Sequence, residues 1–540
     1  MYRKLTQKSH KLSNFPPEIS GGLPVIGHLL QFSGTDSIPL HRKLSSLADK
    51  YGPIFTFRLG IPRVLVVSSY DAVKDCLNIN DKVFAAWPGS LVGEYIGYNN
   101  AMLFLARYGD YWRKIRKIVI NEVLSSNNFP VGGDDVSFTV DGDEFNFLVT
   151  GDQSPVSGEN LDFPVTGDHF PMTGDDFPVD GDDISFIVDG DNVIKPKKQP
   201  LTEIAPDCLI SGANLDFPVT GGDFQVKVNI TNWIEKLTLS LIMKMIAGKS
   251  NGRVEKGGNE EEEEAERFKK GLKDFMSIGF VLWDAFPIPL FKWIDIQGHV
   301  KFMKRTFRDI DCVLQNFVDG YSRETTINAT ALSMVLVASD MTAIHLNWVM
   351  ATLLNHRDAM KKVQDELDTN VGRNRWVEES DIKDLVYFQA VVKETLRLYP
   401  PAPLLAPHES VEDCIVQGYH IPKGTRLWVN TMKLHRDLKI WSNPDTFDPE
   451  RFLTSQAGVD VRGHHYEFIP FGSGRRSCPG ITYATQVTHL AIAHLLQGID
   501  FSTPSDEPLD TKQGLGVTMR KADPIEVVIT PRLPSVLYKF

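Results

Sequence analysis

A glycine-rich loop that delivers one cysteine constrains this 540-residue chain more than any other feature. The loop reads Phe471-Gly-Ser-Gly-Arg-Arg-Ser-Cys-Pro-Gly480, and an apolar segment from Ile481 to Leu496 follows it. Its glycines permit turns that other residues resist and let the backbone approach a flat ligand closely. A cysteine at the start of a helix is biased toward thiolate by the helix dipole and by nearby N–H groups. We therefore expect Cys478 to be a metal ligand or a nucleophile, and the alternative is a buried structural cysteine.

The net charge of the chain is −12, but one segment carries the acidity. Residues 129–223 hold 20 Asp and Glu against 3 Lys, and the remainder of the chain is therefore net positive. The five cysteines are dispersed and show no CxxC spacing, which argues against a disulfide scaffold or a zinc site. A reducing compartment follows, and no nucleic-acid partner is expected.

The acidic segment is internally repetitive. Asn160-Leu-Asp-Phe-Pro-Val-Thr-Gly167 recurs unchanged at 214–221. Gly-Asp repeats bind calcium in some β-rolls, so a calcium-binding repeat protein is one hypothesis, although the GGxGxD spacing of those sites is missing. We interpret residues 129–223 as a low-complexity insertion, mostly disordered, that cannot form a core of its own.

Two helices carry candidate functional residues. The stretch Leu105 to Lys117 opens a helix with Asp110 near its start, which places Trp112 and Arg116 four residues apart, on one face. Ala331 to Leu354 predicts a long buried helix with a polar notch at Ser339, Asp340, Thr342 and His345. A hydroxyl there can bond the carbonyl four residues back, and the small pair Ala338-Ser339 permits local widening. Residues 53–68 alternate and predict a hairpin.

The cysteine loop resembles the haem-binding signature of the cytochrome P450 monooxygenases, Phe-x-x-Gly-x-Arg-x-Cys-x-Gly. Phe471, Gly474, Arg476, Cys478 and Gly480 meet that pattern. The resemblance covers roughly residues 20–125 and 228–540 and is closest to plant A-type members. It implies a mainly α fold with small β-sheets, interrupted by the acidic insertion. The expected organisation is an N-terminal segment with a proline-rich hinge (1–30), the monooxygenase domain in two parts (31–128 and 224–540), and the insertion (129–223).

The resemblance also implies roles for single residues. Cys478 is the axial ligand of haem iron, and Trp112, Arg116, His408 and Arg476 bind the haem, with His408 standing where the family usually has arginine, so that its charge depends on pH. Asp340 and Thr342 are the catalytic pair of the oxygen-binding groove, and Met341 occupies the place of the first threonine. Glu394, Arg397, Arg451 and Phe471 have structural roles in folding and haem retention.

The function implied is insertion of one oxygen atom from O2 into a small apolar plant metabolite, of the alkaloid, terpenoid, coumarin or other phenylpropanoid class. Electrons come from NADPH through a flavin-containing reductase, which docks on the Cys478 side. Candidate docking residues are Arg113, Lys114, Lys117 and Arg475. The family resides on the cytosolic face of the endoplasmic reticulum membrane, although residues 1–30 show no apolar run long enough for an anchor. The second hypothesis is a haem-binding but poorly active or degenerate chain.

Overall fold

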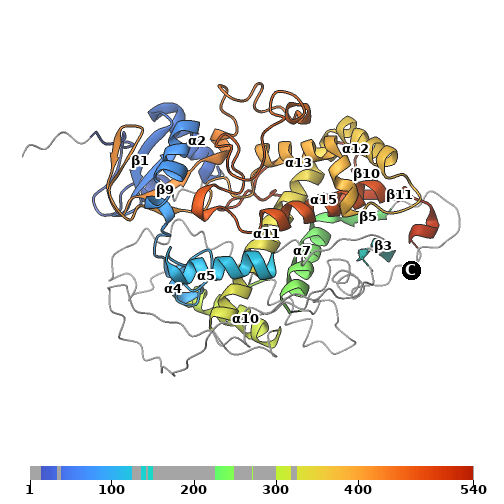
Figure 1. The fold of residues 1–540 in the computed structure, drawn as a ribbon, viewed down its shortest axis with the longest axis horizontal. Helices are drawn as coiled ribbons and strands as arrows, with labels where there is room; N and C mark the ends of the chain where they lie inside the picture. Colours follow the sequence, from blue (N-terminus) through green and yellow to red (C-terminus); the bar gives the residue numbers. More distant parts are fainter. Residues whose placement is uncertain are drawn as a thin grey trace, which may run out of the picture.

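Long helices make up most of the described part of the chain, with one small sheet toward each end of the view in Figure 1, containing β1 and β9 on the left and β5, β10 and β11 on the right. The computed structural model describes residues 14–32, 38–124, 136–141, 144–149, 226–247, 270–271, 299–317 and 325–538. The α-helices are α1 (Leu29–Phe32), α2 (Leu40–Tyr51), α3 (Tyr70–Lys74), α4 (Leu91–Tyr95), α5 (Asp110–Ile118), α7 (Ile230–Ala247), α10 (His299–Phe317), α11 (Thr325–Asn355), α12 (Arg357–Asn370), α13 (Val386–Leu398), α14 (Thr431–Leu434) and α15 (Ile481–Gly498). The mainly helical fold predicted from the sequence is confirmed.

The strands are β1 (Ile54–Arg58), β2 (Arg63–Val67), β3 (Val136–Asp141), β4 (Glu144–Val149), β5 (Val226–Asn229), β6 (His408–Glu409), β7 (Cys414–Val416), β8 (Tyr419–Ile421), β9 (Arg426–Val429), β10 (Ile499–Ser502) and β11 (Glu526–Pro531). Short helical turns labelled η connect them, among them η2 (Val83–Ala85), η8 (Pro449–Phe452) and η9 (Gly474–Arg476). The largest sheet has the order β1-β2-β9-β6. β1 and β2 form the antiparallel hairpin predicted for residues 53–68, with Ile54 opposite Val67.

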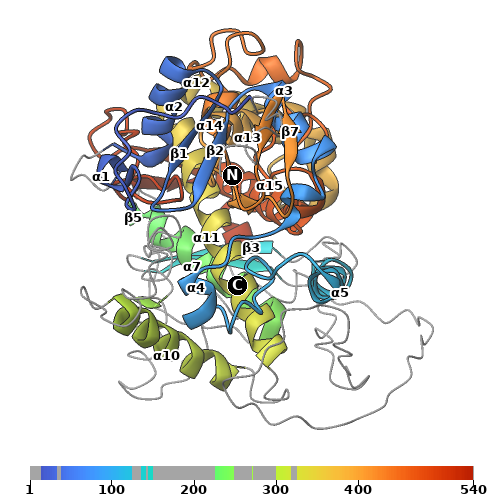
Figure 2. The ribbon, with the colours of Figure 1, turned by 90° about the vertical axis from the view of Figure 1, so that its left-hand side faces the viewer.

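Helix α11 is the central element, and α7, α13 and α15 lie around it (Figures 1 and 2). Its sequence is apolar on all sides, which is typical of a helix buried in a core. Among the described residues, one helix is long and apolar enough to cross a membrane, Thr326–Asn355, but 78% of its apolar window is buried. The polar residues of α11 therefore lie inside the protein.

Helix α5 begins at Asp110, as the sequence predicted, and buries Trp112. Helix α15 begins at Ile481, directly after the cysteine loop. Figure 2 shows the β1–β2 hairpin at one end of the molecule and α4 and α10 at the other, with α11 running between them. The Cys478 loop and α5 thus approach α11 from different parts of the chain.

The first described residues lie along β1. The Pro17 carbonyl accepts from Thr56 N at 2.8 Å, and Gly27 (φ +58°) lies against Arg58. A Cβ at Gly27 would meet the Arg58 carbonyl oxygen at 2.5 Å, so this position of the hinge segment requires glycine. The hinge is therefore fixed onto the sheet.

The acidic insertion is described only at its start, where β3 and β4 pair as an antiparallel hairpin with Asp141 opposite Glu144. Residues 150–223 lie outside the described residues, so the interpretation of this segment as a mostly disordered insertion stays a prediction. The described part of the chain resumes at β5, which pairs with β11 in the sheet β10-β11-β5. Strand β5 leads directly into α7, whose sequence from Ile230 is largely apolar.

Candidate active site

The loop before α15 holds Cys478 by backbone hydrogen bonds. Cys478 N donates to the Phe471 carbonyl at 2.9 Å, and Gly480 N donates to Cys478 Sγ at 3.3 Å. Gly474 (φ +69°) makes a close approach, because a Cβ there would lie 2.5 Å from the Leu77 carbonyl oxygen. The glycines thus allow a tight loop that presents one sulfur, as the sequence predicted.

The charge state of Cys478 differs from the expected thiolate bias. Burial raises the pKa of the thiol, while the Gly480 N–H and the nearby Arg116 lower it by less. The loop alone therefore favours the thiol. A cation bound to the sulfur, such as iron, would supply the stabilisation that the thiolate requires.

Two arginines flank the ring of Trp112 beside this loop. The Arg476 guanidinium lies 4.4 Å from the ring centroid, and that of Arg116 lies 5.2 Å from it. Arg476 Nε donates to the Ala85 carbonyl at 2.6 Å, and Nη2 donates to the Ala106 carbonyl at 2.7 Å. Arg116 Nη2 donates to Ser477 Oγ at 3.3 Å. Helix α5 and the cysteine loop are joined by these contacts.

The two guanidiniums lack an anionic partner among the described residues, since no carboxylate there forms an ion pair with either. Burial lowers the pKa of both guanidiniums. For Arg476, burial and the nearby Arg116 together lower the pKa to about 10. Half-buried cations next to a sulfur ligand fit a ligand that carries both a metal and carboxylates. This arrangement fits the haem that the sequence implied.

Two other predicted haem contacts have protein partners. Trp112 Nε1 donates to the Leu103 carbonyl at 3.1 Å, and His408 Nδ1 donates to the Phe84 carbonyl at 2.7 Å. Burial, with a smaller contribution from Arg476, lowers the pKa of His408 to about 4. His408 is therefore neutral near pH 7, so the pH-dependent charge predicted for this position does not fall in the physiological range. The Nε2 of neutral His408 is an acceptor.

The polar notch of α11 agrees with its prediction in one respect and differs from it in two. The helix is a regular α-helix from Thr325 to Asn355, without the widening that Ala338-Ser339 was expected to permit. Ser339 Oγ instead donates to the Val335 carbonyl, which is the predicted bond to the residue four positions back. Asp340 forms an ion pair with Arg520, a partner that sequence reasoning missed.

The structure does not bring Asp340 and Thr342 together. Successive residues of a regular helix are 100° apart, so the two side chains leave α11 in directions about 200° apart. Thr342 is buried, while Asp340 lies toward Arg520, whose other nitrogen is 3.7 Å from Glu235 of α7. The two residues therefore cannot act as one adjacent pair in this arrangement.

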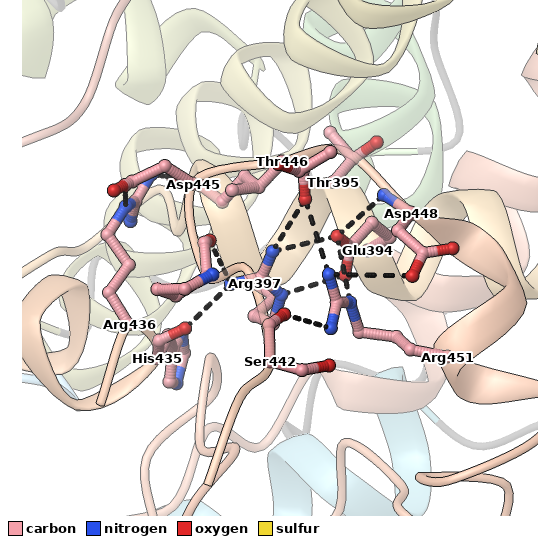
Figure 3. Close-up of polar contacts among 12 residues, drawn as sticks. Glu394, Thr395, Arg397, His435, Arg436, Ser442, Asp445, Thr446, Asp448 and Arg451 are labelled. Atoms are coloured by element: carbon pink, nitrogen blue, oxygen red, sulfur yellow. Dashed lines mark hydrogen bonds and ion pairs between the residues drawn. The ribbon is translucent and has the colours of Figure 1, made fainter. Parts of the chain in front are cut away.

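Glu394, Arg397 and Arg451 interlock beneath the site (Figure 3). Arg397 donates to both carboxylate oxygens of Glu394, at 2.8 and 2.7 Å, and Arg451 Nε donates to the same group at 3.2 Å. All three side chains are at most 3% exposed. Their remaining donors bond the backbone carbonyls of His435, Ser442, Pro444 and Thr446. The cluster therefore ties α13 and η8 to the segment between them.

The candidate docking residues divide into two pairs. Arg113 forms an ion pair with Asp110, and Arg475 forms one with Asp81. Lys114 and Lys117 are exposed on α5. The second pair thus presents its charge directly to solvent.

Several partners in the site gave no signal in the sequence. The carbonyls of Phe84, Ala85, Leu103 and Ala106 accept the bonds described above, and any residue type can supply a carbonyl. Arg520 follows the turn Gly514–Met519 in the sequence, and only the fold shows that it reaches Asp340.

The geometry agrees with comparisons with known proteins. A family model described as "Cytochrome P450" matches residues 16–131 and 310–528. The chain belongs to the cytochrome P450 family. Nicotine N-demethylase CYP82E4 of Nicotiana tabacum is 50% identical over 572 aligned residues, which span 99% of this P450 and 96% of that protein. Vinorine hydroxylase of Rauvolfia serpentina is 41% identical, over 97% of this P450 and 92% of the relative.

Solved structures agree on the fold. A zebrafish cytochrome P450 with progesterone superposes with a TM-score of 0.63 at 21% identity, over 92% of this chain and 100% of that one. Membership in the family makes this protein a haem-dependent monooxygenase of plant specialised metabolism that uses O2 and electrons derived from NADPH. Of the residues described above, Cys478 would hold the haem iron, and Arg116 and Arg476 would hold the haem carboxylates.

Proposed function

We propose that this P450 inserts one oxygen atom from O2 into a small, largely apolar alkaloid, with terpenoids, coumarins and other phenylpropanoid-derived compounds as the further classes. The observation that carries the oxygenation chemistry is Cys478, held by Gly480 N beside two arginines that have no carboxylate partner among the described residues. A cysteine thiolate on haem iron pushes electron density that favours O–O cleavage. The names of two relatives, a nicotine N-demethylase and a vinorine hydroxylase, support the alkaloid class.

The protein's own residues divide the work. Arg116 and Arg476 would fix the haem and Cys478 would donate to its iron, while α11 would form one wall of the substrate space. Trp348 of α11 donates to the Met519 carbonyl at 2.6 Å, and Met519 N donates to the Pro401 carbonyl at 2.9 Å. These bonds fix the turn Gly514–Met519 against α11, so that a substrate there meets a defined, mostly apolar wall.

Electrons would arrive from an NADPH-dependent reductase on the Cys478 side, at the cytosolic face of the endoplasmic reticulum membrane. The exposed Lys114 and Lys117 lie on α5, whose Arg116 contacts the cysteine loop, so they suit an acidic partner surface. Lys114→Glu with Lys117→Glu should slow the first reduction in a salt-dependent manner. Lys423→Glu with Lys512→Glu is the matched control, because it changes the net charge by the same amount at two exposed positions outside α5 and the cysteine loop.

A haem-binding chain with poor turnover is the second candidate function. Met341 favours it, because a thioether cannot donate the hydrogen bond that a threonine at this position would give. The test is turnover of nicotine and vinorine by the purified protein with a plant P450 reductase, NADPH and 18O2. Product with one 18O atom, or with a methyl group removed, supports the first function. Haem-loaded protein that consumes NADPH without any product across an alkaloid panel supports the second.

A further inference from the structure

His345 of α11 is a buried imidazole without a hydrogen bond at either nitrogen among the described residues. It is only 5% exposed. Other buried histidines bond protein atoms: His28 Nε2 lies 2.9 Å from the Ile19 carbonyl oxygen, and His435 Nε2 accepts from Ile469 N at 3.1 Å. Leaving a buried polar nitrogen without any partner is costly, and ordered water often fills such a place.

The position of His345 connects it to the oxygen-binding part of α11. It lies three residues after Thr342 and four after Met341, so it is the next neighbour of both on the helix surface. Asp340 is on another side of α11, where Arg520 occupies it. Among the residues three or four positions from Met341 on α11, His345 is the one with a polar side chain.

The other side of His345 belongs to α15. The two helices pack against each other, and His489 of α15 is close enough to influence the imidazole. Burial, with a smaller contribution from His489, lowers the pKa of His345 to about 3, so the ring is neutral and offers one donor and one acceptor. The helix that packs against α11 here, α15, begins directly after the Cys478 loop.

We propose that His345 holds ordered water in the seam between α11 and α15 and relays protons to the oxygen-binding side of α11, in place of the hydroxyl that Met341 lacks. The proposal rests on the proposed monooxygenase function. In each transfer one imidazole nitrogen gives its proton to the water on the oxygen side, and the other nitrogen takes a proton from water on the solvent side. After the transfer the ring is neutral but in its other tautomer, and no electron has moved. Conversion back to the first tautomer restores the starting state.

The test compares His345→Leu with His345→Gln, which keeps a donor and an acceptor. Thr352→Val is the matched control, because Thr352 is also buried on α11 with a hydroxyl that has no partner among the described residues. The first readout is the infrared C–O stretch of the reduced carbon monoxide complex, which responds to hydrogen bonding near the bound gas. His345→Leu should shift that band to higher frequency. His345→Gln should return the band most of the way to the parent frequency, and Thr352→Val should leave the band at the parent frequency.

The second readout is product formed per NADPH consumed. His345→Leu should lower this ratio and release hydrogen peroxide. His345→Gln should lower it as well, because an amide can hold the water but cannot exchange donor and acceptor between its two polar atoms as the imidazole does. In a Met341→Thr background the His345→Leu effect should shrink, because the restored hydroxyl supplies the hydrogen bond. His345→Leu with an intact thiolate-type spectrum but unchanged band and ratio would overturn the relay and leave the proposed function standing. Loss of the thiolate-type spectrum in the parent would instead overturn the proposed function.

Discussion

Arg520, just beyond the turn Gly514–Met519, forms an ion pair with Asp340 near the middle of α11. The Asp340 side chain is 11% exposed, and its second oxygen has no hydrogen bond among the described residues. Asp340, which was expected to take part in the oxygen chemistry, therefore also links the C-terminal part of the chain to α11.

Removal of Arg520 should strand that carboxylate. We expect Arg520→Gln to lower the free energy of unfolding by about 1–3 kcal/mol, because a buried charged acceptor loses its partner. Adding Asp340→Asn should recover part of the loss, since the uncharged amide needs no cation. Urea unfolding of the four proteins in the cycle measures both effects, and strictly additive losses would contradict a direct coupling.

The Glu394 cluster makes a sharper stability prediction. Glu394→Ala leaves Arg397 and Arg451 as buried cations without their carboxylate, at a cost of about 3–5 kcal/mol, so the protein should express with little haem or aggregate. Glu450→Ala is the control from the same part of the chain, because Glu450 forms an exposed ion pair with Lys362 at 2.6 Å. That loss should be below about 1 kcal/mol. Equal losses in the two variants, measured by haem content and thermal unfolding, would refute the role assigned to the cluster.

Coupling of oxygen use to product should depend on position 341. Met341→Thr restores a hydroxyl donor on the face of α11 that His345 shares, so product per NADPH should rise and peroxide should fall. Thr342→Ala should lower the ratio only if Thr342 has taken over the relay. NADPH, product and peroxide are measured together for the parent and both variants. A parent that releases peroxide, together with a Met341→Thr variant that releases just as much, would contradict this view of the helix.

Acid should destabilise the protein through His408. The pKa of His408 is about 4 in the folded protein against an ordinary value of 6.5. Between pH 4 and pH 6.5 the imidazole is therefore protonated in the unfolded chain and neutral in the folded protein. Stability from neutral His408 is fully present above about pH 6.5 and is lost, by at most about 1.4 kcal/mol per pH unit, as pH falls toward 4. His408→Gln should flatten the fall in urea unfolding across that window. His464→Gln, at an exposed position, is the control, and an equal slope in all three proteins would contradict the assignment.

Local features of the sequence predicted much of this fold. The hairpin β1–β2, the start of α5 and the start of α15 follow from side-chain period and from glycine and aspartate at the boundaries, which act within a few residues. The cysteine loop and the pair Glu394 and Arg397 were visible because one turn or one helix fixes their spacing, whereas only the family resemblance placed Arg451 with them.

The parts that the sequence did not reveal depend on distant partners. Nothing near Asp340 signals Arg520, and nothing near Cys478 shows that burial outweighs the Gly480 hydrogen bond in setting the pKa of the thiol. The widening expected at Ala338-Ser339 is absent because small residues permit such a bulge without requiring it. The side chains of Asp340 and Thr342 point to different sides of α11. Their directions can be assigned only once the helix is known to be regular.

The most direct test of the account is the carbon monoxide difference spectrum of the reduced, purified P450, recorded for the parent, Cys478→Ser and Cys414→Ser. Cys414 is a buried free cysteine on β7 and controls for the substitution itself. The account predicts the thiolate-type band in the parent and in Cys414→Ser, and its loss in Cys478→Ser together with monooxygenase activity, because a hydroxyl is a poor replacement for the electron-donating sulfur. A thiolate-type band that persists in Cys478→Ser would contradict the assignment of Cys478 as the haem ligand.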